Sequence, residues 1–409
     1  MASDLHRTAT TTYLCCVPTL EESAGAGRVG LAGANIQSFY IFTRGIVCVK
    51  NHCIFTLINI CNMLNGKLFA IILLGMLAIG CKEDENELKN LFSIENPSLK
   101  PILKLEERID LVLQNKENKT IDSVVYFIND VKIASVKGNG AISFALNKQK
   151  LGNQTLKANV YFEGKTTEIN TSFSIFASRE PQMLNYSIVN TYPHDINAYT
   201  QGFEFYNGVL LEGTGQYKES TLRKTDHKTG KVTQQIKLED NYFGEGITVL
   251  NGKIYQLTWK EKTGFVYDVN TLKLEKKFTF ETDGWGLTNN GTYLYMSDGS
   301  EKIYIVDPAT FKVIESISVY TAGSKIDSIN EMEWINGKIW ANIYQKDVIA
   351  VIDPKTGAVE NVINCVALKD KVTQHPEVDY FNGIAYNPSS NTYFVTGKNW
   401  DKIFEIKIN

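Results

Sequence analysis

Asn251-Gly-Lys-Ile-Tyr255 shows in five residues the pattern that decides the fold of this chain. An Asn-Gly pair favours a tight turn between antiparallel strands, and the Ile and Tyr that follow favour a strand. Related turn-and-strand segments recur at a spacing of roughly 40–55 residues, the length of one propeller blade. The other four are Asn207-Gly-Val-Leu-Leu211, Asn290-Gly-Thr-Tyr-Leu294, Asn336-Gly-Lys-Ile-Trp340 and Asn391-Thr-Tyr-Phe-Val395.

Each repeat continues with further strands, for example Ile303-Tyr-Ile-Val306 and Lys312-Val-Ile-Glu-Ser316. Five such units predict a five-bladed β-propeller over residues 181–409. The segment 184–189 precedes the first unit, so we expect it to complete the last blade beside 402–406 and to remove an open sheet edge. The longest spacing contains residues 369–379, which we interpret as a loop insertion at the site.

Residues 104–180 contain shorter alternating segments separated by turns such as Lys137-Gly-Asn-Gly140. This spacing predicts a small Ig-like β-sandwich that acts as a spacer or docking module. Residues 82–103 begin with an acidic run and include Asn96-Pro97-Ser98, so we expect a linker there. The predicted fold class is therefore all-β, a sandwich followed by a propeller.

Composition excludes some classes of protein. The formal net charge is −3, which gives no electrostatic reason to expect nucleic-acid binding. After residue 62 the only cysteines are Cys81 and Cys365, so neither a disulfide framework nor a cysteine metal cluster is expected.

A targeting signal is predicted over residues 63–81. Lys67 precedes an apolar run that is too short to span a bilayer comfortably, and the run ends in Leu77-Ala-Ile-Gly-Cys81. Small residues before a cysteine resemble a bacterial lipobox, which predicts lipidation of Cys81. The protein would be exported and anchored to a bacterial membrane, at the periplasmic face or the cell surface. A short membrane anchor or core segment is the alternative, and residues 1–62 are interpreted as a mis-assigned N-terminal extension.

Several segments of the predicted propeller combine glycines with polar or Trp residues. Tyr242-Phe-Gly-Glu-Gly-Ile-Thr248 places a carboxylate between two glycines, and Asp283-Gly-Trp-Gly-Leu287 does the same with a Trp. Glycines allow a ligand to approach the backbone closely. Asn330-Glu-Met-Glu333 and Thr396-Gly-Lys-Asn-Trp400 add an amide and an ammonium group.

With these segments in place, the chain resembles the plant and bacterial family of glutaminyl-peptide cyclotransferases. Nine segments match in family order over about 220 residues. Three are the segments at 242–248, 283–287 and 330–333. The other six are Tyr192-Pro-His-Asp195, Tyr199-Thr-Gln-Gly-Phe203, Leu211-Glu-Gly-Thr-Gly215, Trp340-Ala-Asn-Ile343, Asn382-Gly-Ile-Ala385 and Val395-Thr-Gly-Lys398. The resemblance implies a five-bladed propeller that cyclises N-terminal glutamine to pyroglutamate and releases ammonia.

The resemblance also implies a set of site residues. The catalytic residues of the family correspond to Glu245, Asn330 and Lys398 in this sequence. Its substrate-binding positions fall on Gln201, Phe243, Trp259, Trp285, Tyr199 and Tyr344, where the last two replace a Phe and a Trp of the family. Implied partners are peptides or proteins with N-terminal Gln and, through the anchor, a membrane. We expect no nucleic acid, no catalytic metal, no cofactor and a monomer, while a structural calcium ion in the channel stays open.

The chemistry suits these residue types, because the substrate's own amine is the nucleophile and one carboxylate can carry the proton. Each residue also has a structural interpretation. Glu245 would be a solvated turn residue, Asn330 a turn cap, Lys398 half of an ion pair, and the Trp residues packing between blades. His194 is expected to stabilise the fold.

Two other functions stay open from sequence. A non-catalytic surface propeller could bind peptides or glycans, and would predict a damaged set of acid, amide and amine, although all three are present in this sequence. A propeller hydrolase of the lactonase kind would require a cluster of acidic and amide metal ligands around the channel.

Overall fold

The computed structural model describes residues 85–95 and 99–409. Within them the chain is mostly β, as the sequence predicts, and its strands form seven sheets. The predicted targeting segment, Cys81 and residues 1–62 lie outside the described residues.

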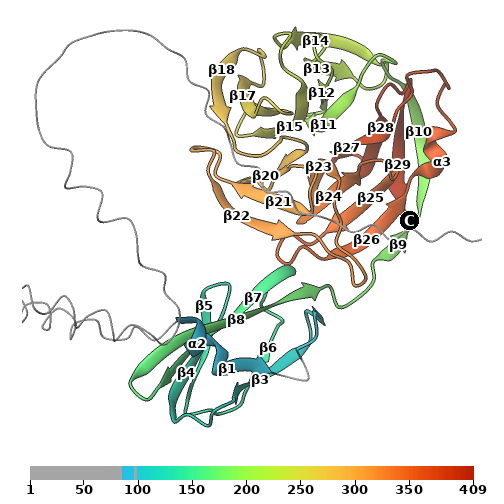
Figure 1. Ribbon diagram of the computed structural model, residues 1–409. Coiled ribbons are helices and arrows are strands. Elements are labelled where there is room, and N and C mark those ends of the chain that lie inside the picture. Colours follow the sequence, from blue (N-terminus) through green and yellow to red (C-terminus); the bar gives the residue numbers. More distant parts are fainter. Residues whose placement is uncertain (1–84, 96–98) are drawn as a thin grey trace, which may run out of the picture. The chain divides into compact units, whose positions relative to one another are not determined.

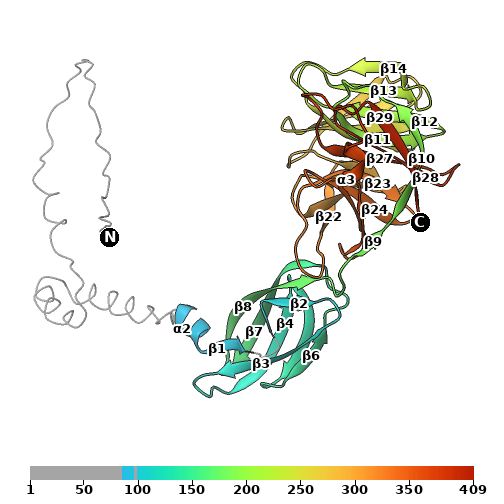
Figure 2. The ribbon, with the colours of Figure 1, turned by 90° about the vertical axis from the view of Figure 1, so that its right-hand side faces the viewer.

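Two sheets that share one apolar core form the N-terminal β region, which spans the described residues up to Phe176 (Figures 1 and 2). The three-stranded sheet consists of β1 (Phe92–Glu95), β3 (Arg108–Asn115) and β6 (Ile142–Ala145). The five-stranded sheet has the order β2 (Ile102–Lys104), β8 (Lys165–Phe176), β7 (Gly152–Phe162), β4 (Ile121–Ile128) and β5 (Val131–Lys137). Alternate residues of β3 are buried, as expected of a strand with one face on a core.

The segment 82–103 is not simply a linker. Its described part contains helix α2 (Glu85–Asn90) and strands β1 and β2. Strand β1 pairs with β3, and β2 runs parallel to β8. Phe92 and Leu103 are buried in the core of the N-terminal β region. The prediction is wrong here because short strands of three or four residues give little periodic signal beside an acidic run.

Five sheets make up the second region, called the ring below (Figure 1). Each contains a four-stranded antiparallel arrangement, and four of them run in chain order. The first of these sheets consists of β11 (Thr200–Tyr206), β12 (Val209–Thr214), β13 (Thr221–Asp226) and β14 (Lys231–Lys237), and the second of β15 (Gly244–Leu250), β16 (Lys253–Thr258), β17 (Thr263–Asp268) and β18 (Leu274–Thr279). The third consists of β19 (Leu287–Asn289), β20 (Leu294–Ser297), β21 (Lys302–Val306) and β22 (Val313–Ser318). The fourth contains β23 (Ile329–Ile335), β24 (Lys338–Ile343), β25 (Val348–Ile352) and β26 (Val359–Asn364).

The last sheet closes the ring. It has the order β10 (Tyr186–Pro193), β29 (Lys402–Ile408), β28 (Thr392–Gly397) and β27 (Phe381–Asn387). Tyr186 lies opposite Ile408 and Pro193 opposite Lys402, so the strand before the first repeat joins the last one, as predicted. Strand β9 (Gln182–Leu184) pairs in parallel with β26, and helix α3 (Val366–Lys369) ends at the first residue of the predicted loop insertion.

One strand of each sheet lies at the centre of the ring and is called its first strand below: β11, β15, β19, β23 and, in the last sheet, β27. These strands contact one another in the order β11, β15, β19, β23, β27 and back to β11. All seven residues of β15 are buried, whereas buried residues are absent from the outermost strands β14 and β18. Residues near the two ends of the first strands are therefore the ones that can build a central site.

The Asn-Gly pairs form the turns that the sequence predicts. Asn251 and Gly252 have φ of 53° and 74°, and they join Leu250 of β15 directly to Lys253 of β16. Positive φ at both turn residues is the geometry that matches the twist of a hairpin.

No described helix is long and apolar enough to cross a membrane.

Candidate active site

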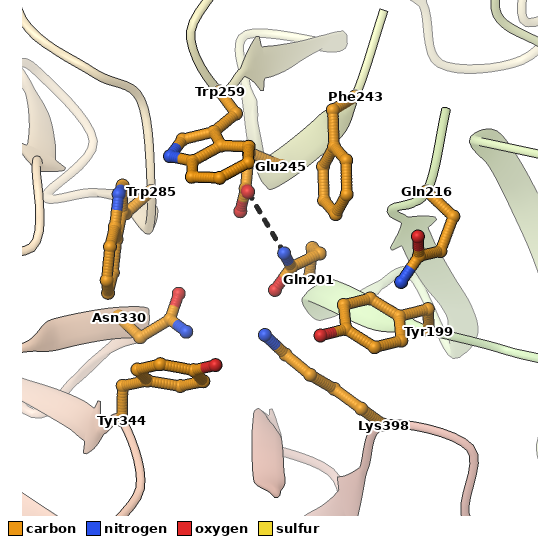
Figure 3. Close-up of a pocket in the computed structure, with 10 residues that line it drawn as sticks. All are labelled: Tyr199, Gln201, Gln216, Phe243, Glu245, Trp259, Trp285, Asn330, Tyr344 and Lys398. Atoms are coloured by element: carbon orange, nitrogen blue, oxygen red, sulfur yellow. Dashed lines mark hydrogen bonds between the residues drawn. The ribbon is translucent and has the colours of Figure 1, made fainter. Parts of the chain in front are cut away.

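One pocket of about 180 Å³ gathers all nine site residues expected from the sequence (Figure 3). It is lined by Tyr199, Gln201, Gln216, Phe243, Glu245, Trp259, Trp285, Asn330, Tyr344 and Lys398. These residues come from all five sheets of the ring or the loops beside them, and only the closed ring brings them together.

Local irregularities of the first strands aim three of these side chains at the pocket. The pairing register of β11 shifts at Gln201, that of β15 between Gly244 and Ile247, and that of β23 between Ile329 and Met332. The bulged positions include Gln201, Glu245 and Asn330. A bulge adds an unpaired residue and redirects its side chain, and bulges are frequent beside active sites. The glycines around Glu245 thus belong to a bulge at the start of a buried strand.

Another group of residues follows the second strand of a sheet. Trp259 comes directly after β16, Tyr344 directly after β24 and Lys398 directly after β28. In an antiparallel hairpin the end of the second strand lies beside the start of the first. Residues before or at the start of a first strand and residues just after the second strand therefore meet at one end of the ring.

Glu245 is only 4% exposed, so the interpretation as a solvated turn residue is wrong. Its Oε1 accepts a hydrogen bond of 3.0 Å from Gln201 Nε2 (Figure 3). Burial raises the pKa of the Glu245 carboxyl well above its usual value, against the opposing effect of the Lys398 ammonium. The carboxyl can therefore hold a proton at a pH where an exposed glutamate would be ionised.

Lys398 reaches the centre of the pocket from the last sheet and is 3% exposed (Figure 3). Its Nζ lies 4.7 Å from the ring centroid of Tyr199 and 4.9 Å from that of Tyr344. Burial lowers the pKa of this ammonium, while Glu245 and Asp379 act in the opposite direction. Two aromatic faces thus hold this ammonium, which leaves it available to a ligand.

Aromatic side chains form the walls of the pocket. The rings of Phe243 and Trp259 are 5.5 Å apart, and those of Trp285 and Tyr344 are 5.7 Å apart, both edge to face. The expectation that Trp residues pack between sheets holds instead for Trp400, which lies in an apolar core. An aromatic wall excludes water and lowers the local dielectric, which accounts for the shifted pKa values of the charged pair.

Two polar atoms of the lining side chains are buried without a hydrogen-bond partner: Asn330 Oδ1 and Trp285 Nε1. A buried polar group without a partner costs roughly 1–3 kcal/mol. Such atoms are acceptable in a pocket where a ligand supplies the missing donor or acceptor. Asn330 is thus not a turn cap, because its side-chain oxygen binds nothing in the described chain.

A sequence model described as "Glutamine cyclotransferase" matches residues 158–408. The chain belongs to the glutamine cyclotransferase family. Arabidopsis thaliana glutaminyl-peptide cyclotransferase is 40% identical over 225 residues, which cover 54% of this chain and 70% of the relative. The crystal structure of Myxococcus xanthus glutaminyl cyclase aligns with a TM-score of 0.53 at 34% identity, over 56% of this chain and 99% of that one.

The match to the glutamine cyclotransferase family begins inside β7 and continues through the ring. The pocket therefore lies within the part of the chain that carries the family match, whereas most of the N-terminal β region lies outside it. Two residues beside the pocket were not expected from the resemblance. Gln216 lines it directly, and the Asp379 carboxylate accepts a hydrogen bond of 2.9 Å from the Tyr199 hydroxyl.

The sequence contains a weak signal for each of the two residues. Gln216 directly follows the matched segment 211–215. In the structure its φ of 86° is unusual for a residue other than glycine. Asp379 ends the predicted loop insertion, and its backbone N–H binds the carbonyl of Lys398. The insertion thus brings a carboxylate to the tyrosine that contacts the buried lysine.

Some polar residues of the matched segments serve the ring rather than the pocket. Glu331 accepts hydrogen bonds from the backbone N–H groups of Phe203 and Ile384, on the first strands of two other sheets. His194 is buried, with Nδ1 2.8 Å from the Trp400 carbonyl oxygen and Nε2 3.1 Å from Glu212 Oε1. A carbonyl and a carboxylate oxygen both accept hydrogen bonds, which favours the doubly protonated ring. Burial lowers its pKa, but Glu212 outweighs burial and the net direction is upward.

The described residues contain no group of three or more His, Cys, Asp or Glu side chains arranged to hold a metal ion. The lining of the pocket offers one carboxylate and neither His nor Cys. Cys365 is a free, buried thiol.

Proposed function

We infer that this chain is a glutaminyl-peptide cyclotransferase, an enzyme that converts N-terminal glutamine of peptides or proteins to pyroglutamate and releases ammonia. The family match and the Arabidopsis relative support this activity. The observation that carries the site assignment is a buried carboxyl, an ammonium and an amide around one small aromatic cavity: Glu245, Lys398 and Asn330.

The reaction makes one bond and breaks another. The α-amine nitrogen of the substrate attacks its γ-carboxamide carbon, the new C–N bond closes a five-membered ring, and the old C–N bond breaks to release ammonia. One proton must pass from the attacking nitrogen to the leaving nitrogen. Glu245 carries it, and burial brings the pKa of this carboxyl closer to that of an α-amine, about 7.7–8.0. A smaller difference between these pKa values makes it easier for Glu245 to take the proton from the attacking nitrogen and to give it to the leaving nitrogen.

Negative charge develops on the carboxamide oxygen as the ring closes. The Lys398 ammonium and the Asn330 side-chain amide stabilise that oxygen, and their effect is large because the aromatic walls exclude water. The same walls restrict the glutamine side chain to a folded pose, which lowers the entropic part of the barrier. No step needs a metal ion or cofactor.

Other features of the chain complete the proposal. The ring is a five-bladed propeller, supported by its five sheets and the closed circuit of first strands. The N-terminal β region is an Ig-like sandwich, supported by two sheets around one core. Lipidation of Cys81 would place the monomeric enzyme on a bacterial membrane facing the periplasm or the outside, supported by the sequence Leu77-Ala-Ile-Gly-Cys81.

The decisive experiment compares wild-type protein with Glu245→Gln on a glutamine-initiated dipeptide, by ammonia release and mass spectrometry of the product. We expect wild type to form pyroglutamate at the same rate with and without a chelator. Loss of a proton shuttle lowers kcat by about 100- to 10,000-fold, so Glu245→Gln should show little turnover.

Glu333→Gln is the matched control. Glu333 is also a buried glutamate on a first strand, burial raises its pKa, and it binds the backbone N–H of Tyr386 instead of lining the pocket. We expect this variant to keep wild-type kcat. Absence of turnover by wild type would refute the enzyme, and full activity of Glu245→Gln would refute the shuttle.

A further inference from the structure

Asn382 is a buried residue beside the site that does not line the pocket. It lies where the register of β27 shifts, between Phe381 and Ile384. Gln201, Glu245 and Asn330 occupy the equivalent bulges of three other sheets. Asn382 is therefore the member of this set that faces another side chain instead of the ligand space.

The Asn382 amide links the last sheet to the first. Its Nδ2 donates a hydrogen bond of 2.9 Å to the Thr200 carbonyl oxygen and one of 3.1 Å to Gln201 Oε1. Gln201 Nε2 in turn donates to Glu245 Oε1 at 3.0 Å. A chain of three hydrogen bonds thus runs from a backbone carbonyl to the carboxyl, through groups that are at most 4% exposed.

The donor-to-acceptor direction of these three hydrogen bonds is fixed by the Thr200 carbonyl oxygen. A backbone carbonyl can only accept, so the nitrogen of the Asn382 amide must face Thr200. The same nitrogen faces Gln201, which must turn its oxygen toward Asn382 and its nitrogen toward Glu245. Asn382 Oδ1 is left buried without a partner. This arrangement is not the one that would satisfy Asn382 best, since a buried oxygen without a partner is destabilising.

We propose that Asn382 is a positioning residue that, through Gln201, keeps Glu245 Oε1 a hydrogen-bond acceptor and restricts the shuttled proton to Oε2. An amide nitrogen can donate but cannot accept, so a proton on Oε1 would face a donor and lose this bond. The same oxygen, Oε2, then takes the proton from the attacking amine and delivers it to the leaving ammonia. This inference rests on the proposed role of Glu245.

Gln201 also sets the acidity of the carboxyl, because a donor favours the ionised form and opposes the effect of burial. The charged groups that face Glu245 are Lys398, Glu261 and Asp283. Three tyrosines face it as well: Tyr199, Tyr217 and Tyr344. None of these groups changes when Asn382 is replaced by a neutral residue, so a shift in the acidity of Glu245 can be attributed to the orientation of Gln201.

The test is Asn382→Ala with Asn289→Ala as its matched control. Asn289 also donates from Nδ2 to a backbone carbonyl of a neighbouring first strand, that of Val249, but it has no contact with Gln201. Without Asn382 the Gln201 amide can turn and accept from protonated Glu245. We expect the acid limb of kcat/KM to rise by about one pH unit in Asn382→Ala and to stay at the wild-type value in Asn289→Ala.

A second measurement does not depend on activity. The difference in unfolding free energy between each protein and its Glu245→Gln derivative, followed against pH, reports the titration of Glu245 in the folded state. We expect this difference curve to move to higher pH only when Asn382 is replaced. If Asn382→Ala does not fold, Asn382→Ser keeps a donor for the Thr200 carbonyl and should give the same shift.

Coinciding curves for wild type and the Asn382 variant would overturn the positioning role, whatever the activities are. If Glu245→Gln itself retains turnover, the shuttle role fails, while the stability curves still decide whether Asn382 orients Gln201.

Discussion

The N-terminal β region and the ring bury different kinds of side chain. The core of the first is a continuous apolar cluster, and the buried polar side chains of its strands are Gln154 and Thr167. The first strands of the ring bury several ionisable groups, among them Glu245, Glu331 and Glu333. Burying a charge is expensive unless it is paired or neutralised. An apolar core is sufficient to hold a β region together, so the polar interior of the ring calls for a separate explanation.

That explanation differs between two kinds of buried ionisable group. Glu331 and Glu333 accept hydrogen bonds from backbone N–H groups of neighbouring first strands, which cannot form a continuous ladder with one another. Glu245 and Lys398 have few partners within the described chain and face a cavity. The first kind stabilises the ring, and the second kind costs stability and supplies the chemistry. Three substitutions test this difference.

The largest effect is expected for Lys398→Met, which removes the buried cation at similar length. Loss of an oxyanion donor lowers kcat by roughly 100- to 1,000-fold, while the fold should remain intact by circular dichroism. Lys260→Met is the control, because the Lys260 ammonium also lies over an aromatic ring, 4.1 Å from the centroid of Trp259, but is exposed. An equal loss of kcat in both variants would show that activity depends on the contact between a cation and an aromatic ring and not on the buried charge.

The next effect is on stability alone. Leu111 is fully buried in the apolar core of the N-terminal β region, and Leu111→Ala should lower the free energy of unfolding by about 2–5 kcal/mol. We expect kcat/KM of the folded protein to stay within about twofold of wild type, because no residue of this core lines the pocket. Denaturant titration and steady-state kinetics at a temperature where the variant is folded measure the two quantities. A tenfold fall in kcat/KM would mean that the two regions do not divide stability and catalysis as proposed.

The smallest effect is a pH-dependent gain in stability for Glu245→Gln. The pKa of Glu245 is raised in the folded state, so its contribution is fully present below the unfolded pKa and is lost as pH rises through the folded pKa. Wild type should therefore lose up to about 1.4 kcal/mol per pH unit relative to the variant above pH 4.5, the ordinary value of this carboxyl. Thermal unfolding of both proteins at several pH values measures the difference. A difference in unfolding free energy between the two proteins that stays constant with pH would contradict the burial of a carboxyl that binds a proton.

The sequence by itself determined the local elements. A two-residue hairpin turn needs left-handed backbone at both positions, which Asn and Gly adopt readily, so Asn251 and Gly252 specify a turn and the flanking apolar residues specify its strands. The spacing of such turns predicted a ring closed by the strand before the first repeat, which pairs with the end of the chain. The segments that resemble the family identified nine site residues, and all nine line one pocket. Short strands such as β1 were missed, because four residues carry too little periodic signal.

Only the tertiary structure decided what surrounds each of those residues. Whether Glu245 is solvated or buried depends on four other sheets, and a local sequence cannot report the desolvation that raises its pKa. Asp379 reaches Tyr199 across 180 positions of sequence. Asn382 reaches Gln201 across 181. These contacts form because the last sheet of the ring meets the first, so ring closure places the acid, the amides and the cation around one cavity.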